Sequence, residues 1–94
     1  MARTIAAAAP RQRVVSTGTV REVHIVDVGP AASCSAVVDD GTGEVTLVFI
    51  GRPEVAGIEK GTRLGFEGTA RMGDGRLVIW NPRYRLEPLD ADHA

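Results

Sequence analysis

The chain has 94 residues and few of the types that build catalytic or metal sites. It contains one cysteine, Cys34, and two histidines, His24 and His93. A zinc site takes several Cys or His ligands, and this chain cannot assemble them. A single cysteine also excludes an internal disulfide, which favours an intracellular protein, and we expect the cytoplasm. We therefore expect no metal, no cofactor, no small-molecule substrate and no enzymatic activity.

Other chemical motifs are missing as well. No glycine-rich phosphate loop of the G-x-x-x-x-G-K-S/T form occurs. Asp39 and Asp40 are adjacent in a glycine-rich stretch, where a turn-forming role is favoured over paired acid–base chemistry. Cys34 falls on the inward row of an expected strand, which favours a buried structural thiol over a nucleophile. No apolar run is long enough to cross a bilayer, and residues 5–9 are too short for a signal-peptide core, so we expect no membrane partner.

Aromatic residues and lysine are scarce, whereas arginine is not. Aromatics make up 4% of the chain, and ten of the eleven basic residues are arginine. Arginine suits bidentate contacts with phosphate, although GC-rich coding gives the same bias. The formal net charge is −1, but residues 71–85 carry four arginines and one acid, and residues 1–21 carry four arginines and no acid. Positive charge thus gathers near both ends of the chain, unless it is merely scattered solvated charge.

The clearest feature that the chain does have is a hairpin over residues 37–51. Side chains alternate between apolar and polar on both sides of the Asp39-Asp40-Gly41-Thr42-Gly43 turn. A two-residue period places alternate side chains on opposite faces of a strand. The inward rows are expected to be Cys34, Ala36 and Val38, then Val45, Leu47 and Phe49.

Two further stretches alternate in the same way, and a third, in which Leu77 to Trp80 are all apolar, completes the set of strands. Residues 14–28 form a long strand whose inward row changes phase at Arg21-Glu22, which predicts a β-bulge, while Gly18 allows a bend. Residues 62–71 form the next strand, and residues 76–86 form the last one, in which Asn81-Pro82 must interrupt regular pairing. The expected inward residues of the first strand are Val14, Ser16, Gly18 and Val20, followed by Val23 and Ile25.

Residues 52–61 are predicted to form a short helix or helical turn that caps one end of the molecule. Pro53 suits a first helical turn, Val55 and Ile58 lie three residues apart, and Gly61 can end the element. The fold class expected is all-β: a five-stranded Greek-key OB-fold barrel with this short helix or helical turn between strands three and four. The barrel spans residues 14–86, between a flexible arm (1–13) and an acidic tail (87–94).

The residues also resemble a known family. The hairpin DDGTGEVTLVFIG, the later strand GTRLGFEGTA and the ending RLVIWNPRY resemble nucleic-acid-binding OB domains of the tRNA-anticodon-binding type. The likeness covers residues 14–86 and is nearest to the wedge domain of the RecG branched-DNA helicase, and small stand-alone actinobacterial OB-fold proteins look similar. The resemblance implies a barrel that binds single-stranded or branched nucleic acid across strands two and three and across the loops that join strands one to two and four to five. Carried onto this sequence, those regions are residues 29–33, Ser35 and Val37, Thr46 and Val48, and residues 71–76.

One cluster of residues suits such a ligand directly. Arginines alternate with aromatics near the end of the chain, which suits phosphate contacts and base stacking. The other interpretation is a solvated edge with the tryptophan packed under a terminus. The cluster consists of Arg71, Arg76, Trp80, Arg83, Tyr84 and Arg85.

An outward apolar row supports an alternative function. Exposed apolar surface commonly marks an interface, so the chain could be a protein-interaction OB module, either a homodimer or a subunit of a larger complex. The same row could instead be covered by the chain's own arm or tail. Its members are Val37, Val48, Ile50 and Val78, with Trp80 beside them.

Overall fold

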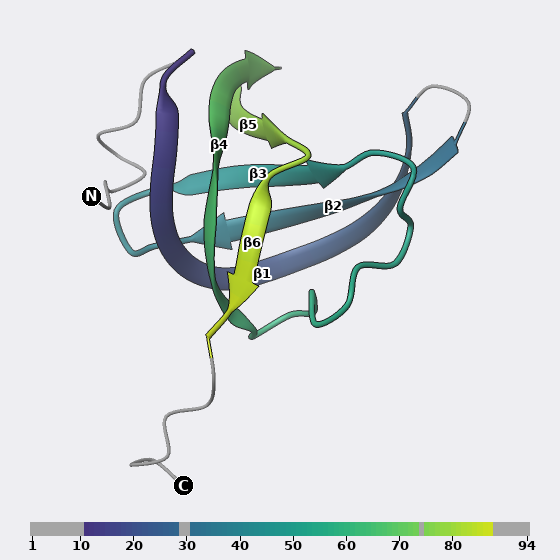
Figure 1. The fold of residues 1–94 in the computed structure, drawn as a ribbon, viewed down its shortest axis with the longest axis horizontal. Helices are drawn as coiled ribbons and strands as arrows, with labels where there is room; N and C mark the ends of the chain where they lie inside the picture. The colour runs from purple at the N-terminus through teal and green to yellow at the C-terminus, as the bar shows by residue number, and fades with distance from the viewer. Residues whose placement is uncertain (1–10, 29–30, 74, 88–94) are drawn as a thin grey trace, which may run out of the picture.

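The computed structural model describes residues 11–28, 31–73 and 75–87, and these residues form six strands (Figure 1). The predicted arm and tail lie outside the described residues except for residues 11–13 and 87. The strands are β1 (Arg13–Val28), β2 (Ala31–Asp39), β3 (Glu44–Phe49), β4 (Arg63–Gly73), β5 (Arg76–Trp80) and β6 (Arg83–Leu86).

Five of the strands close into a ring. The long β1 pairs with β2 through its second half and with β4 through its first half, both antiparallel. The remaining contacts run β2–β3, β3–β5 and β5–β4, of which β3–β5 is parallel. This is a Greek-key barrel of the OB type, as the alternation predicted. The short β6 is added at the outer edge of β4.

The curvature of β1 makes the closure possible. Its register against β2 shifts between Val20 and Glu22, which is the predicted bulge. Gly18 lies where β1 leaves β4 for β2, and a Cβ there would sit 2.7 Å from Val38 Cγ1. Beyond the bulge the predicted inward row is wrong at Ile25, whose side chain is 67% exposed. Ile25 lies in the half of β1 that pairs with β2 alone and has left β4 (Figure 1).

The inward rows of all five barrel strands form one core. Cys34, Leu47 and Phe49 are each at most 1% exposed, and the predicted inward residues of β2 and β3 are all buried. Ser33 is buried as well, and its hydroxyl accepts a hydrogen bond from the Gly51 N–H at 2.9 Å. The cluster also includes Val14, Val20, Ala36, Val38, Val45, Val55, Ile58, Leu64, Phe66, Ala70 and Ile79.

The link between β3 and β4 caps the barrel as predicted, but no helix forms among the residues described there. It contains single turns closed by hydrogen bonds from Ile58 N to Val55 O and from Thr62 N to Glu59 O, both 3.0 Å long. Gly57 and Gly61 adopt φ of 78° and 93°, which a right-handed helix cannot contain. The prediction of a helix is therefore wrong, because these glycines end each turn before a second can form.

The last predicted strand is divided into β5 and β6 at Asn81-Pro82. Asn81 has a φ of 51°, and its side-chain Oδ1 accepts a hydrogen bond of 2.9 Å from the Ile50 N–H. Its own N–H donates to Val48 O at 2.6 Å. The predicted interruption is confirmed, and the chain resumes pairing with β4 afterwards, which adds a sixth strand to the five expected.

Backbone hydrogen bonds join the chain to β4 before the predicted boundary at residue 14. Arg11 N donates to Ala70 O, and Ala70 N donates to Gln12 O at 2.9 Å. Residues 11–13 therefore extend the β1–β4 pair beyond that boundary.

The turn between β2 and β3 is held by its aspartates. Asp39 Oδ1 accepts a 2.6 Å hydrogen bond from Gly41 N, and Asp40 Oδ1 accepts bonds from Thr42 and Gly43. Gly41 adopts a φ of 92°, which a residue with a side chain rarely takes. The predicted turn-forming role of both aspartates is confirmed.

Candidate functional site

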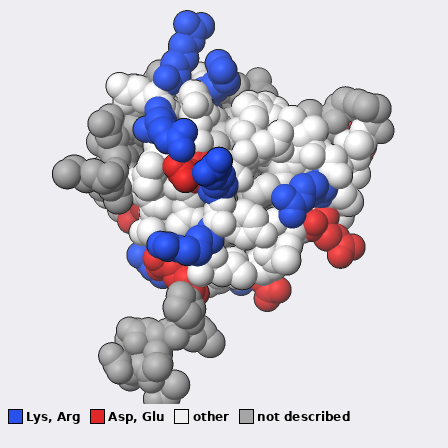
Figure 2. Space-filling view, in the orientation of Figure 1, with Lys and Arg blue, Asp and Glu red and all other residues white. Residues whose placement is uncertain are grey.

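Arginines gather on the outward face formed by β4, β6 and the start of β1. In register, Arg83 lies opposite Glu67, Arg85 opposite Gly65, and Arg13 opposite Thr69. Directly opposed residues point to the same face of a sheet, so these side chains share the outer surface. Figure 2 shows basic side chains spread over this side of the molecule, with acidic ones between some of them.

A hollow opens on this face where β5 and β6 separate. β4 pairs with β5 from Ala70 onward and with β6 up to Glu67, so Gly68 and Thr69 lie between the two pairings. The hollow has a volume of about 380 Å³. We call it the arginine groove; its lining residues are Arg13, Glu67, Gly68, Thr69, Arg71, Trp80, Asn81 and Arg83.

The charges in the arginine groove are only partly neutralised. Arg13 forms an ion pair with Glu67, and both side chains reach solvent, so the pair contributes little to stability. Within the described part of the chain, neither Arg71 nor Arg83 has an ion-pair partner. Trp80 stands beside them with 43% of its surface exposed. Guanidinium groups bind phosphate and an exposed indole stacks on a base, so the groove can do both.

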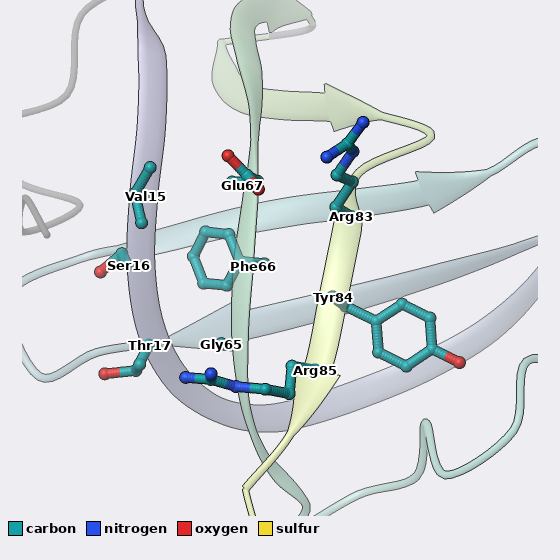
Figure 3. Close-up of a pocket in the computed structure, with 9 residues that line it drawn as sticks. All are labelled: Val15, Ser16, Thr17, Gly65, Phe66, Glu67, Arg83, Tyr84 and Arg85. Atoms are coloured by element: carbon teal, nitrogen blue, oxygen red, sulfur yellow. The ribbon is translucent and has the colours of Figure 1, made fainter. Parts of the chain in front are cut away.

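A second hollow continues from the first, between β1 and β6 (Figure 3). We call it the β6 groove. It has a volume of about 420 Å³ and shares Glu67 and Arg83 with the arginine groove. Its other lining residues are Val15, Ser16, Thr17, Gly65, Phe66, Tyr84 and Arg85.

The structure brings together three residues of the predicted cluster and separates the others. Arg71, Trp80 and Arg83 line the arginine groove, and Arg85 lines the adjoining β6 groove. Arg76 lies at the start of β5, opposite Gly73, and lines neither hollow.

Tyr84 does not fit the predicted stacking role. Its ring packs edge-on against Phe49, with centroids 5.5 Å apart, and its hydroxyl donates to Ala56 O at 3.0 Å. Figure 3 shows its side chain pointing away from those of Arg83 and Arg85. Tyr84 thus joins the core to the link between β3 and β4.

The predicted face on β2 and β3 carries no basic residue. Ser35 lies opposite Val48 and Thr46 opposite Val37, on the outer surface as expected. Neither β2 nor β3 contains lysine or arginine, and their shared end carries Asp39 and Glu44. This face offers hydroxyl groups but no charge that would attract phosphate.

The outward apolar row is less exposed than expected. Val48 and Val78 are only 5% and 8% exposed, because larger neighbours in register flank these short side chains. Val37 is half-buried, so Ile50, at 41%, is the most accessible of the four valine and isoleucine positions. The row therefore gives a small apolar surface, and the homodimer stays a prediction that sedimentation would test.

Sequence reasoning missed Arg13 and Glu67. Arg13 was assigned to the arm, although extending the alternation of β1 back by one residue places it on the same face as Val15 and Thr17. Glu67 lies between the inward Phe66 and Gly68, so its outward position was readable from the alternation. Its pairing with Arg13 was not, because those residues are far apart along the chain.

Outside the grooves, the pKa values of Glu22 and Cys34 are shifted from their ordinary values. The exposed Glu22 carboxylate on β1 forms a 2.9 Å hydrogen bond with His24. This bond and the charge of the His24 ring lower the pKa of Glu22. Burial raises the pKa of the Cys34 thiol. No group of three or more potential metal ligands occurs among the residues that the structure describes. In the same residues, no helix is long and apolar enough to cross a membrane.

Comparison with known proteins supports the fold. No family model and no curated protein matches the sequence. A solution structure of a replication factor A related protein from Methanobacterium thermoautotrophicum is similar, with a TM-score of 0.66 and 15% identity. The match covers 93% of this chain and 91% of that one.

A second solved structure, described as "Structural mimicry for functional antagonism", gives a TM-score of 0.65 at 15% identity. The match covers 90% of this chain but 44% of that one. At these identities the likeness establishes the fold alone. Neither description names a RecG or tRNA-anticodon-binding domain, so that finer resemblance stays a prediction.

Proposed function

We propose that this chain is a non-catalytic OB module that binds single-stranded or branched nucleic acid. The observation that carries the proposal is the arginine groove, in which Arg71 and Arg83 line the same hollow as the exposed Trp80. The likeness to a replication factor A related protein supports nucleic acid as the class of ligand.

The proposed chemistry is mainly electrostatic. Each arginine that neutralises a phosphate releases condensed counterions, so the affinity falls as salt is added. Stacking of one base on an aromatic ring contributes about 1–3 kcal/mol and tolerates any base. Among the described aromatic residues in the grooves, Trp80 is the one that is openly exposed. We therefore expect modest affinity with little sequence preference.

The test is a fluorescence-anisotropy titration of a labelled oligothymidylate of about 15 nucleotides, within the range of OB-fold site sizes. We expect saturable binding at low salt that weakens steeply as salt is raised. The branched form is tested with a labelled three-way junction in the same titration. If neither ligand binds at low salt, the proposal is wrong.

A further inference from the structure

We infer that the bound strand crosses β4 from Trp80 to Arg85, through the arginine groove and the β6 groove, and not across β2 and β3. This path rests on the proposed function and specifies which surface carries it. The occupant is a single strand of nucleic acid, whose phosphates meet the arginines and whose bases meet the floor of the grooves.

Charge favours this path over the β2–β3 face. The walls of the two grooves carry Arg13, Arg71, Arg83 and Arg85, against one acid, Glu67. On β2 and β3 the only charged residues are Asp39 and Glu44. A phosphate backbone is therefore attracted to β4 and β6 and repelled from the end of the β2–β3 hairpin.

The two hollows adjoin over β4. Glu67 and Arg83 line both, and together we call them the trough. From Thr69 to Gly65 the trough follows four steps of strand, about 13 Å at the usual rise per residue. That length accommodates a short run of extended nucleotides.

The floor and rim of the β6 groove differ in chemistry. Gly65, which lies between Thr17 and Arg85 in register, leaves one floor position without a side chain, and Val15, opposite Glu67, is 37% exposed. Figure 3 shows Arg85 reaching from β6 across β4 towards Thr17, while Arg83 lies at the other end of the strand. An apolar floor between two guanidinium groups suits unstacked bases with flanking phosphates. A duplex hides its base faces, so this surface selects a single strand.

The test compares two charge-matched double variants. Arg83→Ala/Arg85→Ala removes two positive charges from the trough. Arg52→Ala/Lys60→Ala removes two from the exposed link between β3 and β4, outside both grooves. We expect the first variant to bind labelled oligothymidylate about tenfold or more weakly and to lose about 0.7 from its salt slope per arginine removed. The second should bind within about twofold of the unchanged protein.

Amide chemical-shift mapping on the unchanged protein provides a second measurement that does not depend on how the variants fold. We expect the largest shifts on β4, β6 and the start of β1. Shifts centred on β2 and β3, or equal losses in the two double variants, would overturn the path while leaving the proposed function intact. Failure of the unchanged protein to bind any oligonucleotide would overturn both.

Discussion

Trp80 belongs both to the cluster predicted from the sequence and to the arginine groove found in the structure. It ends β5, lies opposite Val48 in register and lines the arginine groove. Its place in the arginine groove was predictable. Arg71 and Arg83 are separated from Trp80 by only a hairpin turn and by Asn81-Pro82, respectively. Because Arg83 and Arg85 point outward, alternation places Tyr84 between them on the core side, where its ring is unfavourably placed for stacking.

Replacing Trp80 with alanine should weaken binding without unfolding the barrel. Loss of one stacking platform costs about 1–3 kcal/mol, and the ring is 43% exposed, so the core keeps its packing. Anisotropy titration measures the affinity and thermal unfolding measures the stability. The control is Ile25→Ala, which removes an exposed apolar side chain outside both grooves and should bind normally. Equal affinities of Trp80→Ala and the unchanged protein would contradict a stacking role.

Substituting Glu67 with glutamine should strengthen binding. The Glu67 carboxylate holds Arg13 in an ion pair at the junction of the two grooves, where it also repels an incoming phosphate. Removing that charge frees Arg13 for the ligand. An exposed ion pair contributes about 0.2–1 kcal/mol, so we expect the affinity to rise by a few-fold. Weaker binding by Glu67→Gln would show instead that the carboxylate orders Arg13 for the ligand.

The Cys34 thiol should react slowly while the protein is folded. It is 1% exposed, and burial raises its pKa, so little thiolate is present near neutral pH. Because the unfolded thiol ionises first, stability should fall as the pH rises above the ordinary thiol value of about 8.5. The rate of reaction with a thiol reagent, compared with and without urea, measures how far folding protects the Cys34 thiol. Rapid labelling of the native protein would contradict the burial.

At the scale of elements, the sequence pattern predicted the strands and the β2–β3 turn well, but not the form of the link between β3 and β4. The bulge at Arg21-Glu22 follows from the change of phase in the inward row of residues. The break at Asn81-Pro82 follows because proline lacks a backbone N–H donor. The helix over residues 52–61 did not form, because Gly57 and Gly61 turn left-handed and Val55 and Ile58 gain more by inserting into the core. Such a gain depends on the shape of the barrel end, which no local pattern contains.

Alanine substitutions at two glycines in neighbouring strands should have different effects, one on stability and the other on binding. At Gly18, an added Cβ would lie 2.7 Å from Val38 Cγ1 and 2.8 Å from Asp39 O, so Gly18→Ala should cost about 1–3 kcal/mol of stability. At Gly65, the nearest atom is 3.6 Å away, an ordinary contact. Gly65→Ala should therefore stay stable but raise the floor of the β6 groove and weaken binding. Urea unfolding and anisotropy distinguish the pair, and the reverse pattern would contradict this assignment.

At the scale of the whole molecule, the fold could be predicted because four alternating runs, one apolar run and glycine turns leave few alternatives to a closed barrel. The position of the site could not be predicted, because Arg13, Glu67 and Arg83 come together only through the β1–β4 and β4–β6 pairings. The net charge of −1 likewise hides a molecule in which β2 and β3 carry only acids and β5 and β6 only arginines. Function thus depends on how closure distributes charge over the barrel, not on composition.

The emission of the only tryptophan in the chain reports directly on the groove. Unlabelled oligothymidylate should change Trp80 fluorescence saturably at low salt, because a base stacks on the indole, and added salt should reverse the change as phosphate contacts are lost. A signal that stays constant while anisotropy shows the oligonucleotide bound would place the ligand elsewhere on the barrel and contradict the site described above.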